Sequence, residues 1–188
     1  MAEAAHRLFS AASFEAVTVE DIAREAEFGK GTLYLYFENK DEILFYIFQQ
    51  GIEELLESIR AQCTPDLDVR EALNRYMSLQ YCFYRRYHPL LLALMRRRIE
   101  GNLSPEHFTD TMRKLDLTSD LVAELLARGT REGIIVAIDA RKLARIMKNI
   151  LKGFSLEALE RKDIDGEQDL DLIKLVLGYG IIARGEHD

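Results

Sequence analysis

Apolar residues recur every three or four positions along most of the 188-residue chain, and strand-like alternation persists nowhere. This period matches one face of an α-helix. Only three prolines and eleven glycines interrupt the pattern. The segment 40–62, for example, places its apolar side chains on one side: Ile43, Leu44, Ile47, Phe48, Leu55 and Ile59. The sequence therefore predicts an all-α protein of about nine helices.

Composition adds few constraints. The chain is 48% hydrophobic and 30% charged, as in an ordinary globular protein, with a net charge of −7. The cysteines, Cys63 and Cys82, have neither CxxC nor histidine spacing, so we expect no metal site and no cofactor. We find no signal peptide, no apolar run long enough for a bilayer and no catalytic motif. We therefore expect a cytoplasmic protein that is not an enzyme.

The N-terminal part predicts two short helices joined by a tight turn. Thr18 can cap a helix over 19–25 by accepting a hydrogen bond from the backbone of Asp21. A turn over 27–29 follows, and a second helix is expected over 30–36. Asn39 and Glu42 then form a capping box that opens the helix 40–62. Two helices with this spacing make a helix-turn-helix, whose second helix enters the major groove of DNA.

The second helix, within the string GKGTLYLYF, is rich in hydrogen-bond donors. If one face of it packs inward, Lys30, Thr32, Tyr34 and Tyr36 are distributed over the remaining surface. Phosphate oxygens and base edges accept bonds from such groups, and Gly31 allows close backbone approach. The alternative interpretation is that the tyrosines are ordinary half-buried aromatics and the lysine is solvated.

The segment TVEDIAREAEFGKGTLYLYFENKDEIL resembles the DNA-binding module of the tetracycline-repressor (TetR) family of bacterial transcriptional regulators, and the resemblance covers about residues 5–48. A weaker similarity at 131–159 resembles the approach to that family's dimerising helices. The resemblance implies phosphate or sugar contacts by Thr18, Thr32, Tyr34, Tyr36 and Lys40. It also implies that Lys30, Gly31 and Leu35 read bases.

The sequence departs from the family pattern at several places. Ser13 and Glu27 stand at turn positions where the family usually has glycine, and a positive φ at either would cost about 1 kcal/mol. Glu20 stands where some members have a base-reading arginine. Residues 1–48 hold four cations and nine acids, a net charge of −5. Such a module predicts weak non-specific DNA affinity and a shallow salt dependence.

We expect the rest of the chain, residues 46–188, to bind an effector and to dimerise, with residues 1–45 binding DNA. Candidate ligand-binding residues lie on one predicted helix, 69–87, or just beyond it: Tyr76, Gln80, Phe83 and His88. The family resemblance implies that this region encloses a pocket, whereas the alternative is an ordinary apolar core. Arg96 to Arg98 either attract an anionic effector or form a solvated face.

The last two predicted helices are apolar on more than one side, which exceeds what one packing stripe needs. A four-helix interface between two copies explains this pattern, and a thick monomer core is the alternative. The candidate interface residues are Ile146, Ile150, Phe154, Ile173, Leu177 and Ile181. The sequence thus predicts a dimeric, ligand-responsive transcriptional regulator that acts as a repressor. It would bind a palindromic double-stranded DNA operator and an unidentified small molecule. The rival interpretation is a helical dimer without DNA recognition.

Overall fold

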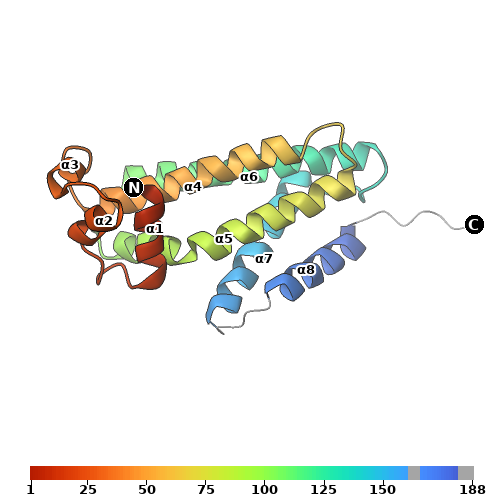
Figure 1. Cartoon of the computed structure of the whole chain (residues 1–188). Coiled ribbons are helices and arrows are strands. Elements are labelled where there is room, and N and C mark those ends of the chain that lie inside the picture. Colours follow the sequence, from red (N-terminus) through yellow and green to blue (C-terminus); the bar gives the residue numbers. More distant parts are fainter. Residues whose placement is uncertain (161–165, 182–188) are drawn as a thin grey trace, which may run out of the picture. The chain divides into compact units, whose positions relative to one another are not determined.

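The computed structural model describes residues 1–160 and 166–181, and all its regular elements are helices, which confirms the all-α prediction (Figure 1). Eight helices are present in this part of the chain: α1 (Ala2–Ala11), α2 (Val19–Glu25), α3 (Lys30–Tyr34), α4 (Lys40–Gln62), α5 (Val69–Ile99), α6 (Pro105–Arg131), α7 (Ala140–Glu160) and α8 (Gly166–Ile181). None of the described helices is long and apolar enough to cross a membrane.

The chain divides into two compact units. The first unit comprises Met1–Glu54 and Arg86–Lys114, and the second comprises Leu55–Arg85 and Leu115–Asp188. The division falls inside α4, α5 and α6, so each of these helices contributes residues to both units. The expected functional boundary near residue 45 is a separate matter and stays a prediction.

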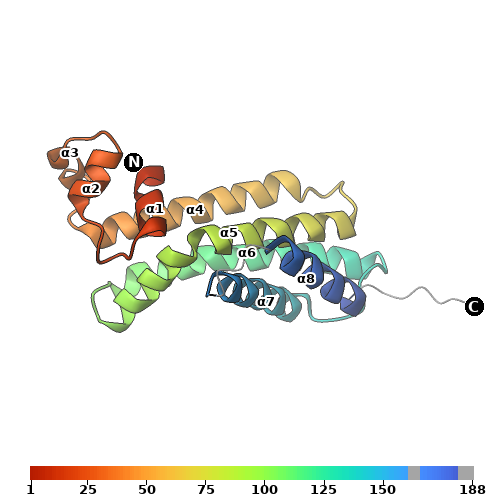
Figure 2. The same cartoon turned by 60° about the horizontal axis from the view of Figure 1, so that its bottom comes forward.

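In the first unit, α2 packs against both α1 and α3, and the three short helices lie together in Figures 1 and 2. Ala5, Phe9, Ile22, Leu33 and Phe48 supply fully or nearly fully buried side chains. Seven- and five-residue helices such as α2 and α3 are too short to be stable alone. Their stability therefore comes from this shared apolar core.

Helix α5 corrects the end of the helix predicted over 69–87, because it continues through Pro89, where proline favours a break, to Ile99. It is one continuous helix with Pro89 in its interior. Proline removes one backbone hydrogen bond and costs about 3 kcal/mol in a helix. Tyr84 and Tyr87 before the proline, and Leu90 and Leu94 after it, are all buried. Burial of these side chains outweighs the local preference for a break.

Capping side chains begin four of the longer helices, and among them the predicted cap Asn39 is confirmed. Asn39 accepts from the backbone N–H of Glu42 at 3.0 Å, and Asp68 accepts from those of Arg70 and Glu71. Ser104 and Asp139 cap α6 and α7 in the same way. One detail differs, because the Glu42 carboxylate accepts from the N–H of Glu38 and not from that of Asn39.

The second unit contains α7 and α8, which pack side by side (Figure 2). Leu126, Met147, Leu151 and Ile173 are buried in its core. The backbone N–H of Val136, before α7, donates to the carbonyl of Ile181 at the end of α8 at 2.9 Å, which ties the two ends together. The predicted turn residue Asp165 and the predicted helix end Arg161 lie outside the described residues.

Candidate nucleic-acid interface and ligand cavity

The start of α2 is fixed by a reciprocal pair of bonds between Thr18 and Asp21. The Thr18 hydroxyl accepts from the Asp21 N–H at 3.1 Å and donates to the Asp21 carboxylate at 2.6 Å. The Thr18 N–H donates to the same carboxylate, which completes a capping box. These bonds lower the pKa of Asp21, the Thr18 hydroxyl being the first cause. Thr18 itself is exposed.

The polar and apolar faces of α3 separate around Leu33. Leu33 is buried, whereas Tyr34, Leu35 and Tyr36 are 46%, 82% and 75% exposed. Thr32 is exposed as well, and a Cβ on Gly31 would meet open space. The helix ends at Tyr34, two residues before the predicted end. Leu35 and Tyr36 follow in a turn in which the Tyr36 N–H donates to the Leu33 carbonyl at 3.0 Å.

Lys30 begins α3 and lies against the helix before it. Its ammonium forms an ion pair with Glu20 on α2, which raises the pKa of Lys30, and it lies 5.7 Å from the Tyr34 ring centroid. The sequence marks Glu20 as a departure from the family pattern, but it does not reveal that Glu20 pairs with Lys30. Ten residues separate the two in the sequence, and only the turn between α2 and α3 brings them together.

Lys40 has a different environment from the one that the family resemblance implies. Its ammonium donates to the carbonyls of Phe14 and Val17 at 2.6 and 2.8 Å, and it lies 4.3 Å from the Phe14 ring centroid. Burial lowers the pKa of Lys40. These contacts hold the segment that precedes α2. We therefore revise Lys40 from a phosphate contact to a positioning residue.

The turn between α2 and α3 contains the one non-glycine residue with positive φ in the described chain, Glu27, at 57°. The Phe28 N–H donates to the Ala23 carbonyl at 2.9 Å and closes the turn. Ser13, the second position where we considered a positive φ, does not have one. Its hydroxyl instead accepts from the Ala16 N–H.

Two short helices at a tight turn, the second with a buried leucine and an exposed row of hydroxyls, define a helix-turn-helix DNA-binding protein. A family model described as "Bacterial regulatory proteins, tetR family" matches residues 2–47. The N-terminal part of the chain therefore carries the DNA-binding module of the TetR family of transcriptional regulators. The family prediction and the prediction of a regulator with a DNA-binding helix-turn-helix are confirmed.

Similarity to other proteins extends beyond the N-terminal residues 2–47 to nearly the whole chain. The HTH-type transcriptional regulator YhgD of Bacillus subtilis is 24% identical over 97% of this chain and 95% of its own. A transcriptional regulator from Saccharomonospora viridis, solved with choline, has a TM-score of 0.81 at 21% identity, covering 97% and 96% of the two chains. FadR of Bacillus subtilis, solved with stearoyl-CoA, has a TM-score of 0.74 at 19% identity, covering 96% and 97%.

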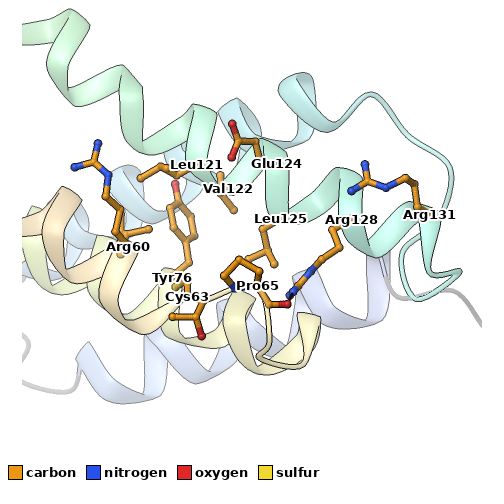
Figure 3. Close-up of a pocket in the computed structure, with 12 residues that line it drawn as sticks. Arg60, Cys63, Pro65, Tyr76, Leu121, Val122, Glu124, Leu125, Arg128 and Arg131 are labelled. Carbon is orange, nitrogen blue, oxygen red and sulfur yellow. Dashed lines mark hydrogen bonds between the residues drawn. The ribbon is translucent and has the colours of Figure 1, made fainter.

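The second unit contains a cavity of about 330 Å³ (Figure 3). Its apolar lining includes Ile59, Leu121, Val122 and Leu125, with Pro65 at the loop after α4. The predicted ligand residue Tyr76 also lines it, and burial keeps the pKa of this phenol well above its usual range. The Tyr76 hydroxyl makes no hydrogen bond of standard geometry with the described residues, although Thr118 lies close enough to favour its ionised form.

The other predicted ligand residues are placed differently. Gln80 is fully buried one turn after Tyr76 on α5, and its amide has no hydrogen bond of standard geometry in the described chain. It lies near enough to the Tyr84 hydroxyl to favour ionisation of that phenol. Phe83 is buried in the same unit but does not line this cavity. His88 belongs to the first unit, where it is buried.

The predicted dimer residues divide into two sets. Ile173, Leu177 and Ile181 are buried within the chain, which corrects their assignment to an exposed interface. Ile146 and Phe154 are exposed and Ile150 is half-buried, so their place in a dimer interface stays a prediction. Three further apolar residues of α8 are absent from the predicted set: Leu172, Leu175 and Val176. All three are more than half exposed on α8.

Proposed function

We propose that this regulator is a two-fold dimeric repressor that binds a palindromic operator and is released from it by a small molecule in the cavity of the second unit. The observation that carries the proposal is the exposed row formed by Thr32, Tyr34, Leu35 and Tyr36 around a buried Leu33. Side chains on the exposed face of a recognition helix are available to bases and phosphates. Lys30 and Gly31 lie at the start of the same row.

Dimerisation is supported by the apolar surface of α7 and α8. Ile146, Phe154, Leu172, Leu175 and Val176 are exposed on two helices that already pack against each other. Methyl groups at Gly153, Gly178 and Gly180 would meet no atom within 4 Å, so a partner helix has room to approach. A two-fold pair of reading helices requires an operator with matching half-sites.

An effector site is supported by the cavity and by the relatives. Proteins of this fold have been solved with choline and with stearoyl-CoA, two compounds of different charge and size. The effector would favour a conformer whose reading helices no longer fit successive major grooves. A coupling free energy of about 1–3 kcal/mol would release the operator about 5- to 150-fold.

The test begins with an operator selected from fragments of the source genome. In fluorescence anisotropy, we expect Tyr36→Ala and Thr32→Ala to lower operator affinity at least about tenfold, since each removes an exposed contact worth about 1–3 kcal/mol. Tyr36→Phe separates the hydroxyl from the ring. Leu117→Ala, at an exposed residue of α6, serves as the control and should bind as wild type does.

The rival function is a helical dimer that has lost DNA recognition. It predicts that no fragment is selected and that the Tyr36 and Thr32 variants behave like the Leu117 control. Sedimentation checks the dimer independently of DNA. A monomer at micromolar concentration, or a Val176→Asp variant that still dimerises, contradicts the proposed interface.

A further inference from the structure

The cavity of the second unit combines an apolar interior with cationic ends. Figure 3 shows Tyr76, Leu121 and Leu125 between Arg60 at one end and Arg128 and Arg131 at the other. Glu124 is the one acidic residue in the lining, so the cavity carries a net charge of +2. The chain as a whole carries −7, and the local charge is therefore opposite to that of the molecule.

The three arginines differ in how they are held. Arg128 donates to the carbonyl of Pro65 and, at 2.8 Å, to that of Leu67, and its Nε makes no hydrogen bond in the described chain. Its nearest ion pair, with Glu132, is long at 3.8 Å. Arg60 and Arg131 are exposed and form no ion pair with any carboxylate of the described residues. Arg60 and Arg131 thus have no carboxylate partner among the described residues, whereas Glu132 and Asp66 lie near Arg128.

We propose that the effector is a small amphipathic anion, an organic acid whose carboxylate lies against the guanidinium groups at one of the two cationic ends and whose apolar body occupies the interior. This inference rests on the proposed function, which makes the cavity the effector site. Guanidinium groups bind carboxylates with charge-assisted, often bidentate hydrogen bonds. A quaternary ammonium or other cation would meet net repulsion at the same place.

The interior sets the rest of the ligand. Ile59, Leu121, Val122 and Leu125 present only hydrocarbon, which favours an alkyl or aryl body. Tyr76 adds a phenol hydroxyl, which is protonated at neutral pH as phenols ordinarily are, and burial raises its pKa further. Its proton is therefore available to an oxygen of the bound acid. A volume of about 330 Å³ lies at the low end of the range for ligand pockets, so a short acid fits better than a long acyl chain.

The test uses three probes with the same eight-carbon chain and different head groups: octanoate, octanol and octyltrimethylammonium. Calorimetry on the full-length protein should show octanoate binding at least about tenfold more tightly than the neutral or cationic probe, as expected for a charge-assisted contact. Equal binding of the three, or tighter binding of the cation, overturns the inference. Failure of octanoate to bind overturns it as well.

Matched double variants test which arginines contribute to octanoate binding. Arg60→Gln with Arg131→Gln should weaken octanoate binding about 3- to 30-fold, a range set by the exposure of both side chains. Arg141→Gln with Arg145→Gln removes the same charge from exposed positions of α7 that do not line this cavity, and should leave octanoate binding unchanged. Arg128 is left intact because it holds the loop after α4. Equal losses in the two double variants contradict the inference.

Operator release separates this inference from the proposed function. If octanoate binding is weakened by the Arg60 and Arg131 substitutions but octanoate leaves operator affinity unchanged, the ligand class stands and the release mechanism is wrong. If a neutral or cationic probe releases the operator and octanoate does not, the effector site stands and the anionic class is wrong.

Discussion

Arg97 and Asp41 form a bidentate ion pair, with Nε and Nη2 of Arg97 each 2.6 Å from one carboxylate oxygen of Asp41. The two side chains are only 23% and 18% exposed. The pair connects the end of α5 with the first turn of α4, the helix that follows the helix-turn-helix of α2 and α3. Hydrogen bonding to Asp41 raises the pKa of Arg97 above its already high ordinary value.

Arg97→Ala should therefore lower the free energy of unfolding by about 1–2 kcal/mol, since it leaves a half-buried carboxylate without its partner. Urea denaturation measures the change. Arg75→Ala, which breaks the exposed pair with Glu71, is the matched control and should cost no more than about 0.5 kcal/mol. Equal effects of the two substitutions would show that the Arg97 pair adds no more than a surface contact.

Glu27→Gly should stabilise the protein by up to about 1 kcal/mol, because glycine adopts the positive φ at this turn without the steric cost that a side chain brings. Ser13→Gly is the contrasting substitution at a position without positive φ. It also removes the hydroxyl that accepts from Ala16, and should destabilise by about 0.5–1 kcal/mol. Thermal unfolding of both variants decides the matter, and a stabilising Ser13→Gly would be the unexpected result.

Gly51→Ala should destabilise the first unit although alanine is the better helix former. A methyl group at Gly51 on α4 would overlap with the ring of Tyr87 on α5. Forcing a methyl into such a contact costs about 1–3 kcal/mol. Gly31→Ala on α3, where nothing lies within 4 Å of the added carbon, should stabilise the DNA-free protein by up to about 1 kcal/mol. Chemical denaturation of the two variants should give opposite signs.

His6 should make stability depend on pH near neutrality. Its Nε2–H donates to the Arg86 carbonyl at 3.0 Å, and burial lowers the pKa of the ring below 6.5. The stabilising contribution is therefore complete above pH 6.5 and is lost as pH falls through the lowered pKa of the folded state. His6→Gln should flatten the curve of unfolding free energy against pH between about pH 7 and 5. Parallel curves for wild type and variant would contradict the assignment.

All four cations of residues 1–48 are already bonded within the first unit. Arg7 pairs with Glu25, Arg24 with Asp21 and Lys30 with Glu20, while Lys40 binds backbone carbonyls. We expect a plot of log affinity against log salt no steeper than about −4 for the dimer. Glu20→Gln frees Lys30 and should tighten binding and steepen the slope by about one per protomer. A steep wild-type slope would show that these cations leave their partners for phosphate.

Local signals were sufficient for most of the fold. Thr18, Asn39, Asp68, Ser104 and Asp139 are capping residues whose bonds involve neighbours two or three positions away, so their helices could be predicted from sequence. Pro89 is a strong local signal that was misleading, because the burial that outweighs it comes from distant parts of the chain.

The site was less predictable for the same reason. The exposure of Tyr34, Leu35 and Tyr36 follows from the position of Leu33 and was expected. The partners of Lys30 and Lys40 are ten and more than twenty residues away, and no short-range pattern reveals them. The cations Arg128 and Arg131 lie on α6, far along the chain from Arg60, so only the fold assembles the cavity. Arg96 and Arg97, considered earlier for an anionic effector, pair with Glu15 and Asp41 instead.

The four cations of residues 1–48 all form bonds within the first unit. This affects how such a protein would locate its operator in a genome. DNA of random sequence offers the protein mainly phosphate charge. A DNA-binding module whose cations are all bonded internally gains little free energy by binding to it. Few copies would be sequestered along the chromosome, and sliding would contribute little to the search. Occupancy of the operator would then follow the free protein concentration closely, so a low copy number would suffice for control.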